Sequence, residues 1–314
     1  MANLNELTCL TTAGNTGVGS CPLDIKNIVG VILAPKGYEF DVTTPEATML
    51  AACLNASPAL RLYPIFDLEN LGDSSEALTV QTLGYGAKHP VREGFNDWNF
   101  QYVAGGLSLH RELRKFNGAA WDFYFVDAKN RVFGIMGSSA TKIKAIPSTG
   151  GFFWATPFKV SDGSKITEYL IQCVFNVKYL NDLYAFVDAG FDVPTGIYGI
   201  ESVNLTGVAD GTSGSYDITA KTASVGTNLG DIYPAALAAA GMWIATNSET
   251  GSTVAVLGAT YDATNKYFVI ACDKTDPDYP GVGQHIKIKM AAPATLDAAG
   301  IHGYESNYVV IAKN

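Results

Sequence analysis

The chain has 314 residues and a formal net charge of −9 at pH 7, and its composition is 47% hydrophobic but only 16% charged. A hydrophobic content this high excludes a disordered chain, and the acidic balance excludes tight binding of nucleic acid, which needs clustered Lys and Arg to displace phosphate counterions. The charged fraction is below the usual value of about 25%, which leaves neutral surface and favours a subunit of an assembly over a free monomer.

No targeting or membrane segment is predicted. The N-terminal residues MANLNELTCLTTAG contain no basic stretch followed by an apolar one, as a secretory signal would. No apolar run reaches the roughly 18 residues needed to cross a bilayer. We therefore expect folding in a cytosol and no membrane partner. The cysteines are widely spaced without a C-x-x-C pair, which argues against a disulfide framework or a zinc site. They are Cys9, Cys21, Cys53, Cys173 and Cys272.

The first predicted elements are buried strands and one helix. IKNIVGVILA at residues 25–34 is a β-branched apolar run that predicts a buried strand. Pro45 suits the first position of a helix, which we expect over residues 45–56. Residues 76–103 alternate in hydropathy and predict two strands joined near His89 and Pro90.

The stretch GLSLHRELRKFNG at residues 106–118 predicts a central amphipathic helix near residues 107–117. Leu109, Leu113 and Phe116 form one apolar stripe that a sheet can cover. The remaining face carries His110, Arg111, Arg114 and Lys115. A catalytic role for these side chains would need an acidic or nucleophilic partner that the sequence does not indicate. We therefore expect this basic face to contact a neighbouring subunit.

The next segment predicts a hairpin, further strands and a short helix. AWDFYFVDAKNRVFGIMG has two aromatic or β-branched runs around a turn at residues 127–130. Residues 152–160 predict another strand, and residues 167–177 alternate with a period of two. A helix over residues 180–189 is expected from an apolar stripe at helical spacing that ends at Gly190.

FDVPTGIYG at residues 191–199 predicts a connector between two domains, at residues 1–195 and 200–314. The second region contains short strand candidates separated by turn clusters such as SETGS and DATNK, a spacing typical of a small β-sandwich. These candidates are residues 201–205, 215–221, 242–247, 253–261, 266–272, 284–290 and 308–313.

Motifs for catalysis and cofactor binding were not found. GTSGS at residues 211–215 does not fit the G-x-S-x-G pattern of a nucleophile elbow, and neither Gly17-Val18-Gly19 nor Gly281-Val282-Gly283 continues into a phosphate-binding loop. The four histidines lie far apart in the sequence. We therefore expect no enzymatic activity, no cofactor and no histidine-built metal site.

One acidic loop is the best metal candidate. Asp273, Asp276 and Asp278 place three carboxylates within six residues and could bind calcium. The loop lacks the glycine and the distal glutamate of an EF-hand, so a solvated turn is the favoured interpretation.

The order of elements resembles the tail tube (major tail) proteins of long-tailed bacteriophages. Up to Gly190 the chain has strands, a long hairpin-like segment, a central amphipathic helix, a tight hairpin and closing strands, and a Thr- and Gly-rich β-region follows. The resemblance covers most of the chain at the level of architecture and rests on no diagnostic motif. It implies a mainly β fold, in which a β-sandwich or barrel with a flanking α-helix precedes a smaller immunoglobulin-like β-sandwich. The residues before the connector exceed a minimal tube domain, which implies insertions or a different virion component.

The resemblance implies a structural virion protein that forms stacked, hexameric rings as a conduit for DNA ejection. It would be located in the virion tail after assembly in the host cytoplasm. Its partners would be copies of itself, other virion proteins, and DNA that passes without specific binding along an acidic lumen. Two alternatives remain ahead of an enzyme. One is another virion component, such as a collar, head-tail adaptor, capsid or decoration protein. The other is a glycan-binding module at residues 200–314.

Overall fold

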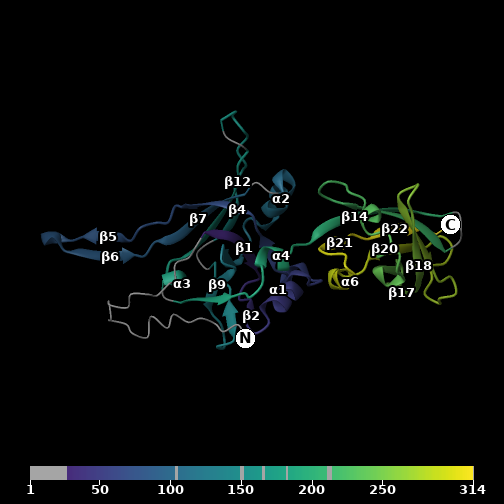
Figure 1. Ribbon diagram of the computed structural model, residues 1–314, viewed down its shortest axis with the longest axis horizontal. Helices are drawn as coiled ribbons and strands as arrows, with labels where there is room; N and C mark the ends of the chain where they lie inside the picture. The colour runs from purple at the N-terminus through teal and green to yellow at the C-terminus, as the bar shows by residue number, and fades with distance from the viewer. Residues whose placement is uncertain are drawn as a thin grey trace. The chain divides into compact units, whose positions relative to one another are not determined.

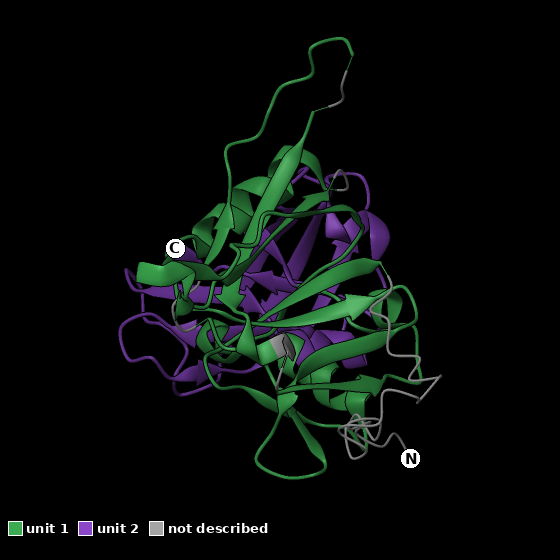
Figure 2. Ribbon diagram, turned by 90° about the vertical axis from the view of Figure 1, so that its left-hand side faces the viewer, with its two compact units in different colours: residues 1–199 green, residues 200–314 purple. Residues whose placement is uncertain are grey.

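The computed structural model describes residues 27–102, 105–148, 152–164, 167–181, 183–210 and 214–313 (Figure 1). The chain divides into two compact units, residues 1–199 and 200–314, which Figure 2 colours separately. The division falls at the end of the predicted connector. Both units consist mainly of β-strands, which confirms the predicted mainly β fold class.

Unit 1 contains a seven-stranded sheet in the order β2-β10-β9-β8-β1-β3, with β13 paired to β9. Its strands are β1 (Ile28–Ala34), β2 (Glu39–Asp41), β3 (Tyr63–Ile65), β8 (Asp122–Asp127), β9 (Arg131–Met136), β10 (Lys142–Lys144) and β13 (Tyr184–Asp188). The predicted strand at residues 25–34 is β1, and its side chains are buried on both faces of the sheet. The predicted hairpin is β8–β9, whose turn is closed by a hydrogen bond of 3.0 Å from Asn130 N to Asp127 O.

A second sheet of four antiparallel strands packs against the first, in the order β11-β12-β7-β4. Its strands are β4 (Leu68–Asp73), β7 (Phe95–Tyr102), β11 (Phe153–Ala155) and β12 (Tyr169–Asn176). The predicted alternation is confirmed in β12, where Ile171, Cys173 and Phe175 are fully buried and the residues between them are partly exposed. Aromatic rings fill the space between the sheets, with Trp98 and Phe125 centroids 4.9 Å apart.

The outer face of the seven-stranded sheet is covered by helices. α1 (Pro45–Cys53) contributes Met49 and Cys53 to a second buried cluster, and α4 (Val193–Gly196) contributes Val193. The expected helix near residues 45–56 is therefore present and slightly shorter. The expected central helix is also present, as α2 (Gly106–Leu113) followed by a 3₁₀ turn, η4 (Arg114–Phe116). A further 3₁₀ turn is η2 (Pro58–Leu60).

The prediction of a helix over residues 180–189 was wrong. A short helix, α3 (Lys178–Asn181), ends before this stretch, and β13 takes up Tyr184–Asp188. β13 pairs along its length with β9, and this pairing buries Phe186 on one face of the sheet and Val187 on the other. A strand buried on both faces is apolar throughout, so it also satisfies a helical spacing of apolar residues.

Unit 2 is a sandwich of two sheets in the orders β18-β19-β15-β14-β21 and β17-β16-β20-β22. The strands are β14 (Glu201–Ala209), β15 (Ser215–Thr222), β16 (Trp243–Asn247), β17 (Thr253–Val254), β18 (Val256–Asp262), β19 (Tyr267–Cys272), β20 (His285–Met290), β21 (Tyr304–Ser306) and β22 (Val309–Ala312). The connections contain α5 (Leu229–Ile232), η5 (Ala240–Met242) and α6 (Pro293–Ala298). When the short strands β17 and β21 are left aside, the other strands can be given the letters A to G in chain order. The sheets β18-β19-β15-β14 and β16-β20-β22 then have the orders D-E-B-A and C-F-G of an immunoglobulin domain, which agrees with the expected immunoglobulin-like sandwich.

Candidate interaction surfaces

A long hairpin arm extends from the four-stranded sheet of unit 1 (Figure 1). We call residues 74–94 the arm; it contains β5 (Thr79–Thr82) and β6 (Lys88–Arg92), with the 3₁₀ turn η3 (Gly84–Gly86) at its tip. Hydrogen bonds from Ser74 N to Asp97 O (2.8 Å) and from Glu76 N to Phe95 O (2.9 Å) continue the pairing of β4 with β7 into the arm. At the tip, Tyr85 and Gly86 have φ of 64° and 80°, as a tight hairpin turn requires.

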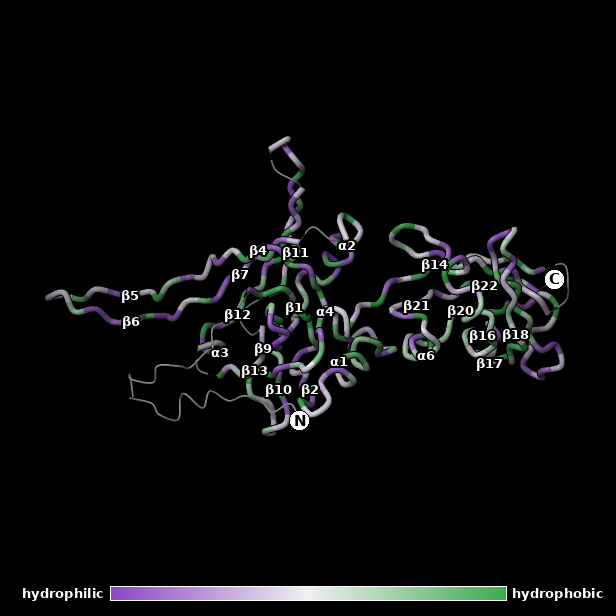
Figure 3. Tube along the Cα trace, in the orientation of Figure 1, coloured by the Kyte–Doolittle hydropathy of each residue, from purple (hydrophilic) through white to green (hydrophobic). Residues whose placement is uncertain are grey.

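The arm has no core of its own. All residues from 69 to 93 are exposed, and Figure 3 shows hydrophobic and hydrophilic segments alternating along it. Its exposed large apolar side chains are Leu78, Val80, Leu83, Tyr85 and Val91. A two-stranded ribbon is only marginally stable in water and leaves both its edges open to pairing. The arm would therefore be stabilised by a partner that covers it.

The sequence prediction placed the turn of this hairpin wrongly. His89 and Pro90 lie inside β6, where Pro90 is opposite Val80, and the chain turns earlier, around Tyr85. Proline is tolerated there because both strands of an isolated ribbon are edge strands. The Gly-Tyr-Gly stretch at residues 84–86 was the signal for the turn that the sequence reasoning missed.

The outer face of the four-stranded sheet combines apolar side chains, among them Phe95, Leu170 and Val174, with a group of uncharged amide side chains. From β4 to β12 these side chains are Asn70, Asn99, Gln101, Gln172 and Asn176. Asp97 lies on the same face and accepts hydrogen bonds of 2.8 and 2.9 Å from Nε2 of Gln172. Trp154 of β11 is opposite Gln172 in the register and is 41% exposed. The face is thus nearly neutral, with amide and apolar side chains interspersed.

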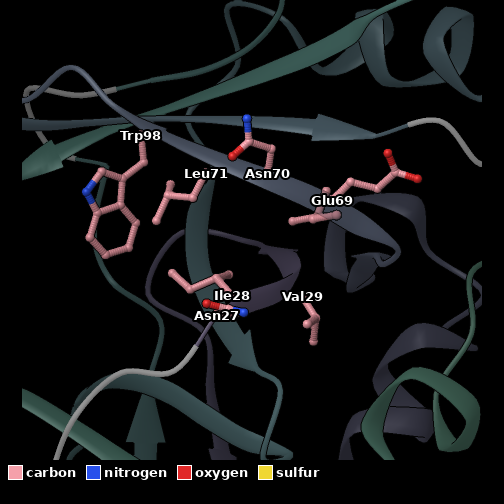
Figure 4. Close-up of a pocket in the computed structure, with 8 residues that line it drawn as sticks. Asn27, Ile28, Val29, Glu69, Asn70, Leu71 and Trp98 are labelled. Atoms are coloured by element: carbon pink, nitrogen blue, oxygen red, sulfur yellow. The ribbon is translucent and has the colours of Figure 1, made fainter. Parts of the chain in front are cut away.

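The β4 edge of this sheet is open, whereas at the β11 edge the side chain of Asn117 hydrogen-bonds both the backbone N–H (2.7 Å) and the backbone C=O (3.0 Å) of Ala155. In the described part of the chain, β4 pairs only with β7, and β11 pairs only with β12. A groove of about 610 Å³ lies beside the β4 edge, between β4 and the first residues of β1 (Figure 4). Its lining residues are Asn27, Ile28, Val29, Leu68, Glu69, Asn70, Leu71 and Trp98. The open β4 edge with its adjoining groove can accept a strand from another chain.

Three of the four predicted basic residues of the central helix are on its surface. Arg111, Arg114 and Lys115 are exposed, and Lys115 forms an ion pair with Glu112. Arg111 and Arg114 have no ion pair with any other residue that the structure describes. These two guanidinium groups are available to an acidic partner.

His110 does not lie on this exposed face, so its expected position was wrong. Its side chain is only 2% exposed and is surrounded by Tyr102, Tyr169 and Phe158, with ring centroids at 6.3, 5.4 and 6.0 Å. Nδ1 hydrogen-bonds the Tyr102 hydroxyl at 2.8 Å, while Nε2 is buried without a partner. Burial, assisted by the nearby charge of Arg114, lowers the pKa of His110. His110 therefore lies with Leu113 on the buried side of α2. The hydroxyl of Tyr102, which makes this burial possible, comes from the sheet and could not be inferred from the helix sequence.

The calcium candidate in unit 2 is a turn in which the carboxylates of Asp273 and Asp276 are engaged by hydrogen bonds within the loop and from Ala255. Asp273 accepts hydrogen bonds from the backbone and hydroxyl of Thr275 at 2.8 and 2.7 Å, which hold the pKa of Asp273 below its usual value. Asp276 accepts from the backbone N–H groups of Asp278 and Ala255, both at 2.9 Å. Within the described ranges, no three His, Cys, Asp or Glu side chains are grouped to hold a metal ion.

Comparison with known protein families, with curated proteins and with solved structures finds no match for this chain. Among the described residues, every helix is too short or too polar to span a bilayer.

Proposed function

We propose that the protein is a structural subunit that assembles with copies of itself into rings, as in a phage tail tube. The exposed apolar arm is the observation that carries this proposal. A ribbon without a core, with apolar side chains such as Leu83 and Tyr85 at its tip, is stabilised when a second subunit covers it. The low charge of the chain is consistent with extensive contact between subunits.

The open β4 edge of the four-stranded sheet supplies one side of a contact that can form a ring. β4 of one subunit can pair with a strand of the next, and repetition of one heterologous contact generates a closed ring. The amide-rich outer face would then become continuous around the ring. A nearly neutral surface of this kind would let DNA pass without strong adhesion, because it offers no clustered Lys or Arg to bind phosphates. This replaces the acidic lumen expected from the overall charge.

The proposal is tested by electron microscopy and sedimentation of the full-length protein. Stacked rings or tubes support the tail tube function. Isolated rings contradict the tube and favour another virion component, such as a collar or head-tail adaptor. A monomer at all concentrations overturns self-assembly.

Two variants locate the contact. Leu83→Asp with Tyr85→Asp places charges at the arm tip and should abolish assembly while the thermal unfolding of the chain is unchanged. Leu60→Asp is the control, since Leu60 is an exposed leucine outside the arm, at 59% against 44% for Leu83. Assembly of the arm variant at the level of the wild type would exclude the arm as the contact.

A further inference from the structure

The outer face of the sheet β17-β16-β20-β22 in unit 2 is basic although the chain is acidic. Lys287 and Lys289 project from β20 on this face, between residues buried in the core. Val310 of β22, 53% exposed, is opposite Lys287 in the register. Lys289 Nζ lies 4.8 Å from the ring centroid of Tyr308. Neither lysine forms an ion pair with a described residue. We call this surface the lysine face.

The outer face of the other sheet has an acid at its centre. Asp217 of β15 lies between Val208 of β14 and Val269 of β19, and Val208 is 63% exposed. One carboxylate oxygen, Oδ1, is buried and has no hydrogen-bond partner. Burial and the neighbouring charges of Asp210 and Asp262 raise the pKa of Asp217. We call this surface the aspartate face.

The environment of Asp217 disfavours its charge in an isolated subunit. A desolvated carboxylate beside two other acids is costly, and an unpartnered oxygen adds to that cost. The other charged residue of β15, Lys221, is four residues further along the strand, about 13 Å away. A cation brought against this face by another subunit would offset the cost by stabilising the charge of the carboxylate.

The two faces have matching composition. Each places one charge next to an exposed valine, Lys287 beside Val310 and Asp217 beside Val208. The faces belong to the two sheets of one sandwich and point away from each other, so they cannot meet within one unit. A two-fold contact would oppose each face to itself and bring like charges together.

We propose that unit 2 of one copy packs its lysine face on the aspartate face of unit 2 of the next copy. The contact is head-to-tail, and Lys287 pairs with Asp217 while the flanking valines cover the pair. This interaction goes beyond the proposed assembly of unit 1, because it uses neither the arm nor the open β4 edge.

The proposal is tested by disulfide cross-linking of the full-length chain. The background carries Cys9→Ser and Cys21→Ser, and the described cysteines Cys53, Cys173 and Cys272 are buried. Val310→Cys is combined with either Val208→Cys or Val269→Cys, because these two valines flank Asp217 on opposite sides. Mild oxidation of at least one of the two double variants should give a ladder of cross-linked oligomers, since each copy links to the next.

The single-cysteine variants are the controls for symmetry. A head-to-tail contact gives no cross-link in any single variant. A dimer from one cysteine alone shows a two-fold contact and overturns the proposal, as does the absence of a ladder from both double variants.

Exchanging the charges of Lys287 and Asp217 distinguishes loss of a specific contact from loss of folding. Lys287→Asp or Asp217→Lys should each reduce the ladder by at least about tenfold, and the two together in one chain should restore it. Lys274→Asp changes the net charge equally and should leave the ladder intact, since Lys274 lies in the loop after β19. A double exchange that stays as weak as the single variants contradicts the pairing.

The arm variant separates this contact from the proposed function. In the background of Leu83→Asp and Tyr85→Asp, the ladder should persist even though rings no longer form. A ladder that disappears together with the rings would show that unit 2 makes no contact of its own, and would overturn the inference while leaving ring assembly supported.

Discussion

The hydroxyl of Tyr102 lies 2.8 Å from Nδ1 of His110, and this hydrogen bond joins β7 of the four-stranded sheet to α2. The other ring nitrogen, Nε2, is buried without a partner. A neutral imidazole fits this site, but an imidazolium would bury an unpaired N–H donor and a charge.

The stability of unit 1 should therefore decrease in acid. The pKa of His110 is lowered by burial, so between the unfolded value of about 6.5 and the lower folded value the unfolded chain binds more protons. The contribution of neutral His110 to stability is fully present above the unfolded pKa and is lost as the pH falls through this window. Thermal unfolding at pH 7.5, 6.0 and 5.0 measures the effect. His110→Gln retains a hydrogen-bonding side chain and should show a smaller loss; an equal loss would exclude His110 as the cause.

Reversing the charge of the helix surface should prevent assembly. Arg111 and Arg114 are exposed and unpaired by other described residues, so Arg111→Glu with Arg114→Glu replaces attraction of an acidic neighbour by repulsion. We expect a folded monomer in sedimentation experiments. Lys36→Glu with Lys129→Glu changes the net charge equally at two exposed turns and should assemble as the wild type does. Normal rings from the arginine variant would remove this helix from the interface.

The β8–β9 turn depends on a buried ion pair. Asp127 is fully buried and accepts hydrogen bonds from Arg131 Nε (2.8 Å) and from the backbone N–H groups of Lys129 (2.9 Å) and Arg131 (3.1 Å). Asp127→Ala removes the carboxylate partner of a buried guanidinium and should reduce the free energy of unfolding of unit 1 by about 3–5 kcal/mol. Urea unfolding measures this change. Lys129→Ala in the same turn should alter stability by less than about 0.5 kcal/mol, and similar effects from both variants would contradict the importance of the pair.

The aromatic core between the sheets should be sensitive to volume. Phe175 is fully buried, and its ring centroid lies 5.1 Å from that of Trp98 and 5.5 Å from that of Phe125. Phe175→Ala should destabilise unit 1 by about 3–5 kcal/mol through lost burial and a cavity. Phe175→Leu retains most of the volume and should cost much less, about 1.5 kcal/mol. Denaturant unfolding of the two variants checks the order, and equal losses would show that packing of the ring is not what matters.

Local signals predicted those elements whose structure is set by nearby residues. Pro45 begins α1, the period of two in β12 matches its one buried face, and the turn residues after Asp127 close the β8–β9 hairpin. β13 was missed because its apolar residues fit two periods equally well, and only its pairing with β9 decides between them.

The candidate surfaces were less predictable than the elements. The sequence identified Arg111 and Arg114 as exposed, since a helix must place charge opposite its apolar stripe. It did not place His110, because the partner hydroxyl of Tyr102 comes from a strand on the other side of a turn. It also did not reveal the arm, because an exposed ribbon and a packed hairpin share the same alternation of residues.

The sequence by itself determined a mainly β chain with an amphipathic helix, a connector and a second small sandwich, because hydropathy periods and turn residues act over short distances. Only the tertiary structure decided which strands have neighbours and which edges stay open. It alone placed Asp217 and Lys287 on opposite outer faces of unit 2, because sheet order depends on pairing between strands far apart in the chain.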